Sequence, residues 1–281
     1  MKLLVTGSKG QLGTDLLNEL EKRGHQFIGV DVEEMDITDE AKVREVLMSA
    51  EVDGVIHCAA HTAVDRAEDE VDLVRKINAL GTEYIAKCCG EKDIPMMYIS
   101  TDYVFDGEGE TPWDPDDLDR RPLNIYGQTK YEGELAVEKY VKDYYIVRIA
   151  WVFGLNGNNF IKTMLKLSES RSELDVVEDQ VGSPTYTYDL ARLLVDMMET
   201  DKYGRYHATN VGFCSWYEFA KEIFRQAGVE MKVNPVTSDK FPAKAKRPHN
   251  SRMDQSKLIE NGFVPLPTWQ DALKRYLEVI K

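Results

Sequence analysis

The chain has 281 residues, of which 43% are hydrophobic and 30% are charged, a balance that excludes collagen, coiled coil and disorder. No run approaches the ~18 uncharged apolar residues of a membrane helix, and the first apolar run is too short for a signal peptide, so we expect neither. With 35 basic and 49 acidic residues the net charge is −14, and nucleic acid is not an expected partner.

Short apolar runs alternate with helical patterns through the first half of the chain. The apolar runs predict strands over residues 2–6, 27–31, 54–58, 96–100 and 145–149. Helices are predicted from Leu12 to Gly24, after a Thr38 cap (with Val43, Val46 and Leu47 on one face), and over about 71–89 and 128–141. Because apolar strands that alternate with helices form parallel sheets covered on both faces, we predict an α/β fold with a Rossmann-type doubly wound parallel sheet.

The second half of the chain is less regular. Helices are predicted near 160–170, 188–200, 215–227 and 268–280, and strands near 174–178 and 205–209. Ser215 with Glu218 predicts a capping box. Most of this half forms a smaller, mixed α/β C-terminal domain in our interpretation.

Two charged segments with prolines are predicted to be loops. Residues 106–119 hold seven acids and no base, and residues 240–252 hold five Lys or Arg, one His and no acid. A solvated face is the simpler interpretation of both. A divalent ion on the first and a diphosphate on the second stay open as alternatives, and Arg247 suits phosphate geometry.

The cysteines and histidines show no metal-binding pattern. Cys58, Cys88, Cys89 and Cys214 form no C-x-x-C pair, and the five histidines have no H-E-x-x-H spacing. We therefore expect buried thiols, a reducing cytoplasmic compartment and no metal site.

A glycine-rich turn follows the first predicted strand and opens a helix. Gly7, Gly10 and Gly13 form a G-x-x-G-x-x-G segment. Glycines permit a tight turn and let backbone N–H groups approach a pyrophosphate, and the helix N-terminus adds partial positive charge. The strand–turn–helix context predicts a dinucleotide site.

Asp31 ends the second predicted strand, where an acid would bond the adenosine ribose hydroxyls. A carboxylate there repels a 2′-phosphate, which favours NADH over NADPH. A solvent-facing Asp is the competing interpretation. Asp36 and Ile37 are predicted to lie beside the adenine.

Tyr126 and Lys130 form a Y-x-x-x-K pair on one face of a predicted helix. An ammonium nearby favours the phenolate and lowers the tyrosine pKa from about 10, which makes tyrosine a usable acid–base group. A second match, Tyr217 with Lys221, falls inside the capped helix and is interpreted as structural. Thr101 ends the fourth strand at the same sheet edge as the glycine turn, where its hydroxyl can stabilise oxyanion charge.

With these residues the chain resembles the extended short-chain dehydrogenase/reductases and, within them, the dTDP-4-dehydrorhamnose reductase family. The resemblance spans nearly the whole chain. The segments that carry it are GSKGQLG at 7–13, HCAAHTAVDRAE at 57–68, INALGT at 77–82, STDYVFDG at 100–107, YGQTKYEGE at 126–134, RIAWVFG at 148–154, DQVGSPTYTYDLA at 179–191 and RPHNSRMD at 247–254. His61 stands where the family has tyrosine, and Met253 where it has leucine.

The resemblance implies reduction of the 4-keto group of dTDP-6-deoxy-L-lyxo-4-hexulose by NADH or NADPH, giving dTDP-L-rhamnose. Tyr126 would donate the proton, Lys130 would lower its pKa and hold the nicotinamide ribose, and Thr101 would bind the carbonyl oxygen. The implied cofactor contacts also include Gly7, Gly10, Gln11, Leu12, Gly13, Asp31, Asp36, Ile37, Ala59, Ala60, Thr62 and Asn78. The implied sugar-nucleotide contacts are Val64, Asp65, Asp102, Tyr103, Trp151 and Arg247, with core packing as the competing role for Trp151.

The expected domains are an NAD(P)-binding domain of residues 1–150 plus about 178–210, and a substrate-binding domain of about 151–177 and 211–281. A homodimer is common in such a family, and the sequence does not decide it.

Two other functions compete with this interpretation. A nucleotide-sugar 4,6-dehydratase is disfavoured because Tyr103, and not Glu, follows Asp102, whereas a 4-epimerase or another nucleotide-sugar reductase of the same fold is harder to exclude. A non-catalytic regulatory subunit, similar to the β-subunit of methionine adenosyltransferase, is the alternative outside enzymes.

Overall fold

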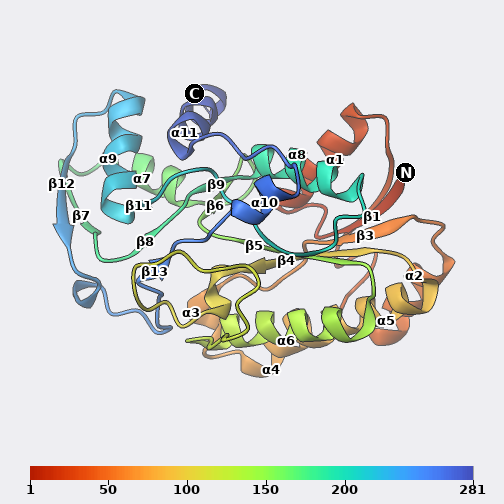
Figure 1. Ribbon diagram of the computed structural model, residues 1–281. Helices are drawn as coiled ribbons and strands as arrows, with labels where there is room; N and C mark the ends of the chain where they lie inside the picture. Colours follow the sequence, from red (N-terminus) through yellow and green to blue (C-terminus); the bar gives the residue numbers. More distant parts are fainter. Residues whose placement is uncertain (281) are drawn as a thin grey trace.

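Six parallel strands form the sheet at the centre of the molecule (Figure 1). The computed structural model describes residues 1–280. The strands are β1 (Lys2–Thr6), β2 (Gln26–Val30), β3 (Gly54–His57), β4 (Met96–Thr101), β5 (Tyr144–Ile149) and β10 (Gly204–His207), in the order β10-β5-β4-β3-β1-β2. The strand order reverses between β1 and β3, and in open α/β sheets ligands bind at such a reversal, beyond the carboxyl ends of the strands.

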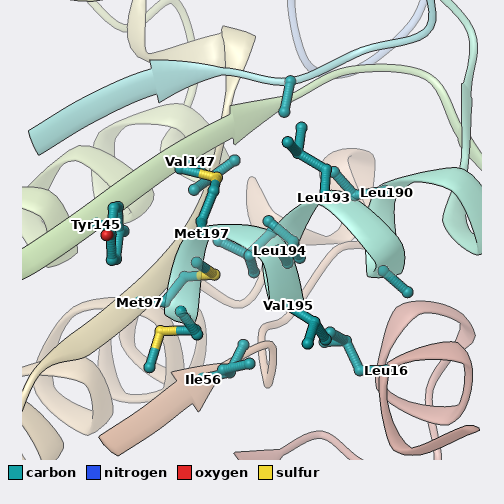
Figure 2. Close-up of a cluster of buried hydrophobic side chains, with 14 of the residues drawn as sticks. Leu16, Ile56, Met97, Tyr145, Val147, Leu190, Leu193, Leu194, Val195 and Met197 are labelled. Carbon is teal, nitrogen blue, oxygen red and sulfur yellow. The ribbon is translucent and has the colours of Figure 1, made fainter. Parts of the chain in front are cut away.

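Helices cover both faces of this sheet because alternate strand residues point to opposite sides. Leu3 and Val5 lie in the core under α1 (Gln11–Lys22) and α8 (Thr187–Met198). Leu4 lies in the core under α2 (Glu40–Ser49), α5 (Thr82–Lys92) and α6 (Ile125–Tyr140). Figure 2 shows the first of these cores, where leucines of α8 meet Ile56, Met97 and Val147 of the sheet. Each fully buried leucine contributes roughly 1.5–3 kcal/mol, and the predicted doubly wound fold is confirmed.

A helical segment with a wide turn connects β3 to β4. After the short α3 (Val64–Ala67), α4 (Val71–Arg75) continues through a π-helical turn, η1 (Lys76–Gly81), into α5. The predicted helix over 71–89 is therefore present but not regular. At Gly81 a Cβ would lie 2.9 Å from the Ile37 carbonyl oxygen, so the helix approaches the loop after β2 closely.

The rest of the chain builds a smaller mixed unit beside the sheet (Figure 1). Its core joins Phe153, Phe219 and Tyr276. Its helices are α7 (Phe160–Ser168), α9 (Trp216–Ala227) and α11 (Trp269–Ile280), whereas the short α10 (Ser256–Glu260) packs on the core of the large sheet through Leu258. The short turns η2 (Asp102–Val104) and η3 (Ser238–Lys240) complete the chain. Its strands pair as β7 (Glu173–Val177) with β12 (Lys232–Val236), β6 (Val152–Phe153) with β9 (Thr185–Tyr186), and β8 (Val181–Gly182) with both β11 (Cys214–Ser215) and β13 (Asn250–Ser251).

The predictions of helix caps and loops are confirmed in part. The capping box of Ser215 and Glu218 is confirmed. The Thr38 cap is wrong: Asp39 caps α2 by accepting from the Lys42 amide, while the Thr38 hydroxyl is turned to Asp36. The predicted loop 240–252 contains the short strand β13. Over residues 1–280, the structure holds no helix long and apolar enough to cross a membrane.

Gly13→Ala tests the tight turn after β1. A Cβ at Gly13 would lie 2.1 Å from the Gly7 carbonyl oxygen, whereas one at Gly10 would lie 3.2 Å from the same atom. We expect Gly13→Ala to lower the free energy of unfolding by about 1–3 kcal/mol, the usual range for overpacking, and the control Gly10→Ala to lower it by less than about 1 kcal/mol. Urea unfolding of both variants measures this, and equal losses would contradict the role assigned to Gly13.

Candidate active site

A cavity of about 1030 Å3 opens at the carboxyl ends of β1, β3, β4 and β5. Most of the residues predicted from the sequence line it. They are Gly7, Gly10, Gln11, Leu12, Gly13, Asp31, Asp36, Ile37, Ala59, Ala60, Thr62, Val64, Thr101, Asp102, Tyr103, Tyr126, Lys130, Trp151 and Arg247. Asn78 and Asp65 do not line it, and each has another role described below.

The glycine turn forms one wall of the cavity as a backbone cradle. Gly7 has a φ of 64°, and a Cβ there would lie 2.8 Å from the Ala59 amide nitrogen. The Gly10 amide donates to the Gly7 carbonyl at 3.0 Å, and α1 starts at Gln11 without a side-chain cap. The free N–H groups at this helix start suit an anion such as a pyrophosphate.

The end of β2 forms an acidic edge of the cavity. Asp31 accepts hydrogen bonds from the Lys9 amide at 3.1 Å and from the Val32 amide at 2.9 Å. The Lys9 ammonium is paired with Glu33 at 2.7 Å and with Glu34 at 3.1 Å. The only cation in this group is therefore already neutralised by carboxylates.

Tyr126 stands on the first turn of α6, which packs tightly on the chain after β4. Asn124 caps the helix by accepting from the Gly127 amide at 2.8 Å, and a Cβ at Gly127 would lie 2.2 Å from the Tyr103 carbonyl oxygen. Burial raises the pKa of Tyr126 to about 12, and a hydrogen bond with Thr101 acts in the opposite direction. The phenol is therefore protonated at neutral pH.

Lys130 lies one helical turn further along α6, with its ammonium turned to the sheet. Its Nζ donates to the Ile99 carbonyl at 2.7 Å and lies 4.1 Å from the centre of the Tyr98 ring. Burial lowers the pKa of Lys130 to about 7, while the charge of Glu134 raises it. The pKa of Tyr126 is therefore raised, and not lowered as the sequence predicted, because burial of the phenol outweighs any stabilisation of the phenolate by the ammonium.

Asp102 is a buried carboxylate that links Thr101 to the C-terminal segment. The Thr101 hydroxyl donates to its Oδ1 at 2.9 Å, and the Ser251 hydroxyl donates to its Oδ2 at 2.5 Å. Burial raises the pKa of Asp102 to about 6. Because Asp102 takes the Thr101 hydrogen and the Tyr103 amide donates to Thr101 Oγ1 at 3.3 Å, one lone pair of Thr101 is left to accept from a donor such as the Tyr126 phenol.

Trp151 closes the cavity on the side of the smaller unit. Its ring stacks on Trp216 with 3.6 Å between centroids, and a Cβ at Gly182 would lie 2.9 Å from it. Its φ of 49° is rare for a large residue and costs on the order of 1–3 kcal/mol. The two tryptophans offer a flat apolar wall to a ligand.

The segment 240–248, which we call the strap, contributes Phe241, Arg247 and Pro248 to the cavity lining. Arg247, which lines the cavity, is paired with Asp65 at 2.6 Å, and the Ala245 amide donates to the same carboxylate at 3.1 Å. Against the effect of burial, these two partners hold the pKa of Asp65 below its usual range. The Lys246 carbonyl accepts from the Asn124 side chain at 2.8 Å. Asp65 therefore holds the strap, in contrast to the predicted cavity contact.

Asn78 was predicted to touch the cofactor but is buried behind the cavity wall. Its side chain accepts from the His61 amide at 2.8 Å and donates to the His61 carbonyl at 3.1 Å and to Thr129 at 3.2 Å. It therefore shapes the loop after β3, whose residues Ala59 and Ala60 do line the cavity.

The acidic run 106–119 is an anchored loop. Trp113 stacks on Phe105 at 4.6 Å, and its amide donates to the Arg252 carbonyl at 2.9 Å. The Pro115 carbonyl accepts from Arg148 at 3.0 Å. Among the described residues, no three His, Cys, Asp or Glu side chains are grouped to hold a metal ion, in this loop or elsewhere.

Sequence reasoning missed part of the cavity lining. Some of the missed residues, such as Thr6, Met35 and Ile149, belong to the large sheet and its loops. Others come from the smaller unit and include Phe160, Met164, Gln180, Trp216, Phe241 and Ser251. Trp216 directly follows the capping residue Ser215, but an aromatic residue on an amphipathic helix is usually core, and nothing in the local pattern points it at a ligand.

Known proteins resemble this chain over its full length. A family model described as the RmlD substrate binding domain matches residues 1–281. The spore coat polysaccharide biosynthesis protein SpsK of Bacillus subtilis is 41% identical over 99% of this chain and 97% of its own. A dTDP-4-dehydrorhamnose reductase from Clostridium acetobutylicum superposes with a TM-score of 0.97 at 43% identity, over 100% of this chain and 99% of its own. One from Bacillus anthracis, in complex with NADP, has a TM-score of 0.95 at 41% identity over 99% of both chains.

The fold and the site together define an extended short-chain dehydrogenase/reductase, an oxidoreductase class with a nicotinamide cofactor. Within that class, the full-length matches place the chain in the RmlD family, which is that of the dTDP-4-dehydrorhamnose reductases. The predicted family is therefore confirmed.

Asp65→Ala tests how the strap is held. Without this carboxylate the Ala245 amide and Arg247 lose their partner, and we expect amide hydrogen exchange across 240–248 to become roughly tenfold faster, about 1.4 kcal/mol in local opening. The control is Asp72→Ala, an exposed acid on α4. Unchanged exchange in Asp65→Ala would show that other contacts hold the strap.

Proposed function

We propose that this chain reduces the 4-keto group of dTDP-6-deoxy-L-lyxo-4-hexulose to dTDP-L-rhamnose with NADH or NADPH. The observation that carries the proposal is the meeting of Thr101, Tyr126 and Lys130 in one cavity with the glycine cradle. The family of the chain supports this substrate, since relatives that match its full length are named dTDP-4-dehydrorhamnose reductases.

The residues present fit a dinucleotide. Gly7 and Gly13 let the turn pack closely, because a Cβ at either would collide with the backbone of Ala59 or Gly7, and the uncapped start of α1 adds N–H donors for the pyrophosphate. Asp31 would accept from the ribose hydroxyls, and Asp36 and Ile37 would lie beside the adenine. The remaining wall is formed by Gly10, Gln11, Leu12, Ala59, Ala60 and Thr62. When bound, the cofactor supplies the hydride.

Tyr126 would supply the proton to the carbonyl oxygen. The pKa of about 12 keeps its phenol protonated at neutral pH, which suits a donor in the reductive direction. The sequence predicted that the Thr101 hydroxyl binds the carbonyl oxygen, but its hydrogen is taken by Asp102, so Thr101 would instead hold the phenol in place by accepting from it. The Lys130 ammonium would stabilise the phenolate left after proton transfer.

The sugar nucleotide would lie between the tryptophan wall and the strap. A deoxysugar presents a largely apolar face, which suits the ring of Trp151. Arg247 is the strap cation that lines the cavity, and its planar guanidinium suits a diphosphate. Val64, Asp102 and Tyr103 would complete this end of the site, with Asp65 acting on the substrate through Arg247.

Tyr126→Phe tests the proton donor. We expect turnover to fall by roughly 10²–10⁴-fold while the dinucleotide still binds, because only the phenolic proton is lost. Loss of NADH or NADPH absorbance is followed with dTDP-4-keto-6-deoxyglucose and the 3,5-epimerase that makes the L-lyxo sugar. Turnover at the wild-type rate would reject Tyr126 as the donor.

The same assay with the wild-type chain separates the competing functions. Oxidation only when the epimerase is present supports the proposed substrate, and oxidation without it supports another nucleotide-sugar reductase. No oxidation with either cofactor supports a regulatory binding protein.

Asp31→Ala tests the proposed preference for NADH. The carboxylate repels a 2′-phosphate, and Lys9, the nearest cation, is paired with Glu33 and Glu34. We expect a higher kcat/KM for NADH in the wild type and a ratio that shifts roughly tenfold toward NADPH in the variant, about 1.4 kcal/mol. Asp53→Ala, at the opposite end of the strands, is the control. Since the Bacillus anthracis relative is in complex with NADP, a wild-type preference for NADPH is the outcome that would reject this role of Asp31.

A further inference from the structure

A fully buried ion pair lies where α6 meets the end of the sheet. The Glu134 carboxylate, on α6, accepts from Arg148 Nε at 2.8 Å and from Arg148 Nη2 at 2.9 Å. The Ser100 hydroxyl donates to the same carboxylate at 2.6 Å. Both charged side chains have no exposed surface. Neither residue lines the cavity, and the proposed reaction gives neither a role.

Glu134 lies one helical turn after Lys130, so both side chains share one face of α6. They also meet consecutive residues at the end of β4. The Lys130 ammonium is bound to the Ile99 carbonyl, and the Glu134 carboxylate is bound to the next residue, Ser100. The ammonium and the carboxylate are therefore fixed to adjacent residues of β4, the first through a backbone carbonyl and the second through a side-chain hydroxyl.

The other groups around the Lys130 ammonium carry no negative charge. Burial lowers the pKa of His57 to about 3 and raises that of Cys58 to about 12, so both are neutral near pH 7. The Tyr98 ring lies against the ammonium, and burial raises its pKa and that of Tyr126 above 10. Among the described residues, Glu134 is the carboxylate that stabilises the charge on Lys130.

Cations on the far side of Glu134 keep this carboxylate ionised. Against the effect of burial, Arg148 and Ser100 lower the pKa of Glu134, and Arg120 at 3.8 Å adds to them. Beyond these, Arg205 is paired with Glu138 at 2.6 Å, and burial keeps His207, beside Arg148, neutral. The charges thus alternate from Lys130 through Glu134 to Arg148.

We propose that Glu134 is a positioning residue that keeps the Lys130 ammonium charged and in place for the reduction. A buried ammonium without a counter-charge releases its proton near neutral pH, and a neutral lysine would no longer stabilise the phenolate of Tyr126. This inference rests on the proposed role of Lys130, and its test therefore measures the lysine directly as well as through activity.

The test is an NMR titration of Lys130 in cofactor-free protein with 13C-labelled lysine. The Lys130 13Cε signal is assigned by its absence in Lys130→Arg. We expect the midpoint in Glu134→Gln to lie at least one pH unit below that of the wild type, a tenfold change in the proton-binding constant. The alkaline limb of the kcat profile should move down by the same interval.

The matched control is Glu138→Gln, one turn further along α6 and paired with Arg205. Its Lys130 midpoint should equal that of the wild type. An unchanged midpoint in Glu134→Gln, or an equal shift in both variants, would overturn the proposal.

Glu134→Gln leaves Arg148 buried without its partner and can fail to fold. The double variant Glu134→Gln with Arg148→Met removes both charges, and we expect it to show the lowered midpoint as well, because the charge of Glu134, and not that of Arg148, acts on the pKa of Lys130. An unchanged midpoint in the double variant would also overturn the proposal.

Lys130→Met separates this inference from the proposed function. Wild-type turnover in Lys130→Met would reject the role of the lysine itself. Lost turnover in Lys130→Met, together with an unchanged midpoint in Glu134→Gln, would reject only the inference about Glu134.

Discussion

The architecture of this protein depends on a close backbone-to-backbone contact, made possible by glycines without side chains, at the point where the strand order reverses. The carbonyl of Gly7 lies where a side chain on Gly13 would be, and the backbone of Ala59 lies where a side chain on Gly7 would be. The turn after β1, the start of α1 and the loop after β3 are therefore packed more tightly than any other residues would allow. This packing brings the N–H groups of α1 to the cavity wall and leaves a cradle free of side chains.

A second set of close contacts fixes α6 to the end of β4. A Cβ at Gly133 would lie 2.4 Å from the Tyr98 hydroxyl, as one at Gly127 would collide with the Tyr103 carbonyl. Asn124 caps the same helix and also holds the strap. Because helix, strand and strap share these contacts, the hydroxyl of Thr101 and the phenol of Tyr126 keep their relative positions without help from a ligand. The buried pair of Glu134 and Arg148 joins the same helix to β5.

The sequence predicted those features that follow from local periodicity and from spacing within one segment. Apolar runs predicted five of the six strands of the large sheet, and the glycine turn and the Y-x-x-x-K pair predicted two walls of the cavity. The sixth strand, β10, was predicted near 205–209, outside the regular alternation of the first half. The sequence did not predict contacts between distant segments. Asn78 bonds the loop at His61, and Trp216 stacks on Trp151, each through long-range packing that no local pattern encodes. The cap of α2 shows that prediction can also fail within one segment. Thr38 and Asp39 are both good capping residues, and the residue at which the backbone becomes helical determines which of them is the cap.

The charges at the cavity explain how an acidic protein can hold an anionic ligand selectively. Lys9 is paired with Glu33 and Glu34, Arg247 with Asp65, and Lys130 is balanced by Glu134. Each cation at the site thus has a carboxylate partner from this chain. An anion that enters must bind the cation with a better geometry than the carboxylate it displaces. Otherwise replacing one partner by the other gives no gain in binding free energy. A planar, bidentate match to Arg247 meets that requirement, whereas a single charge does not. The geometry of the anion therefore matters more for binding at this site than its charge does. This agrees with the net charge of the chain, −14, which repels anions at long range.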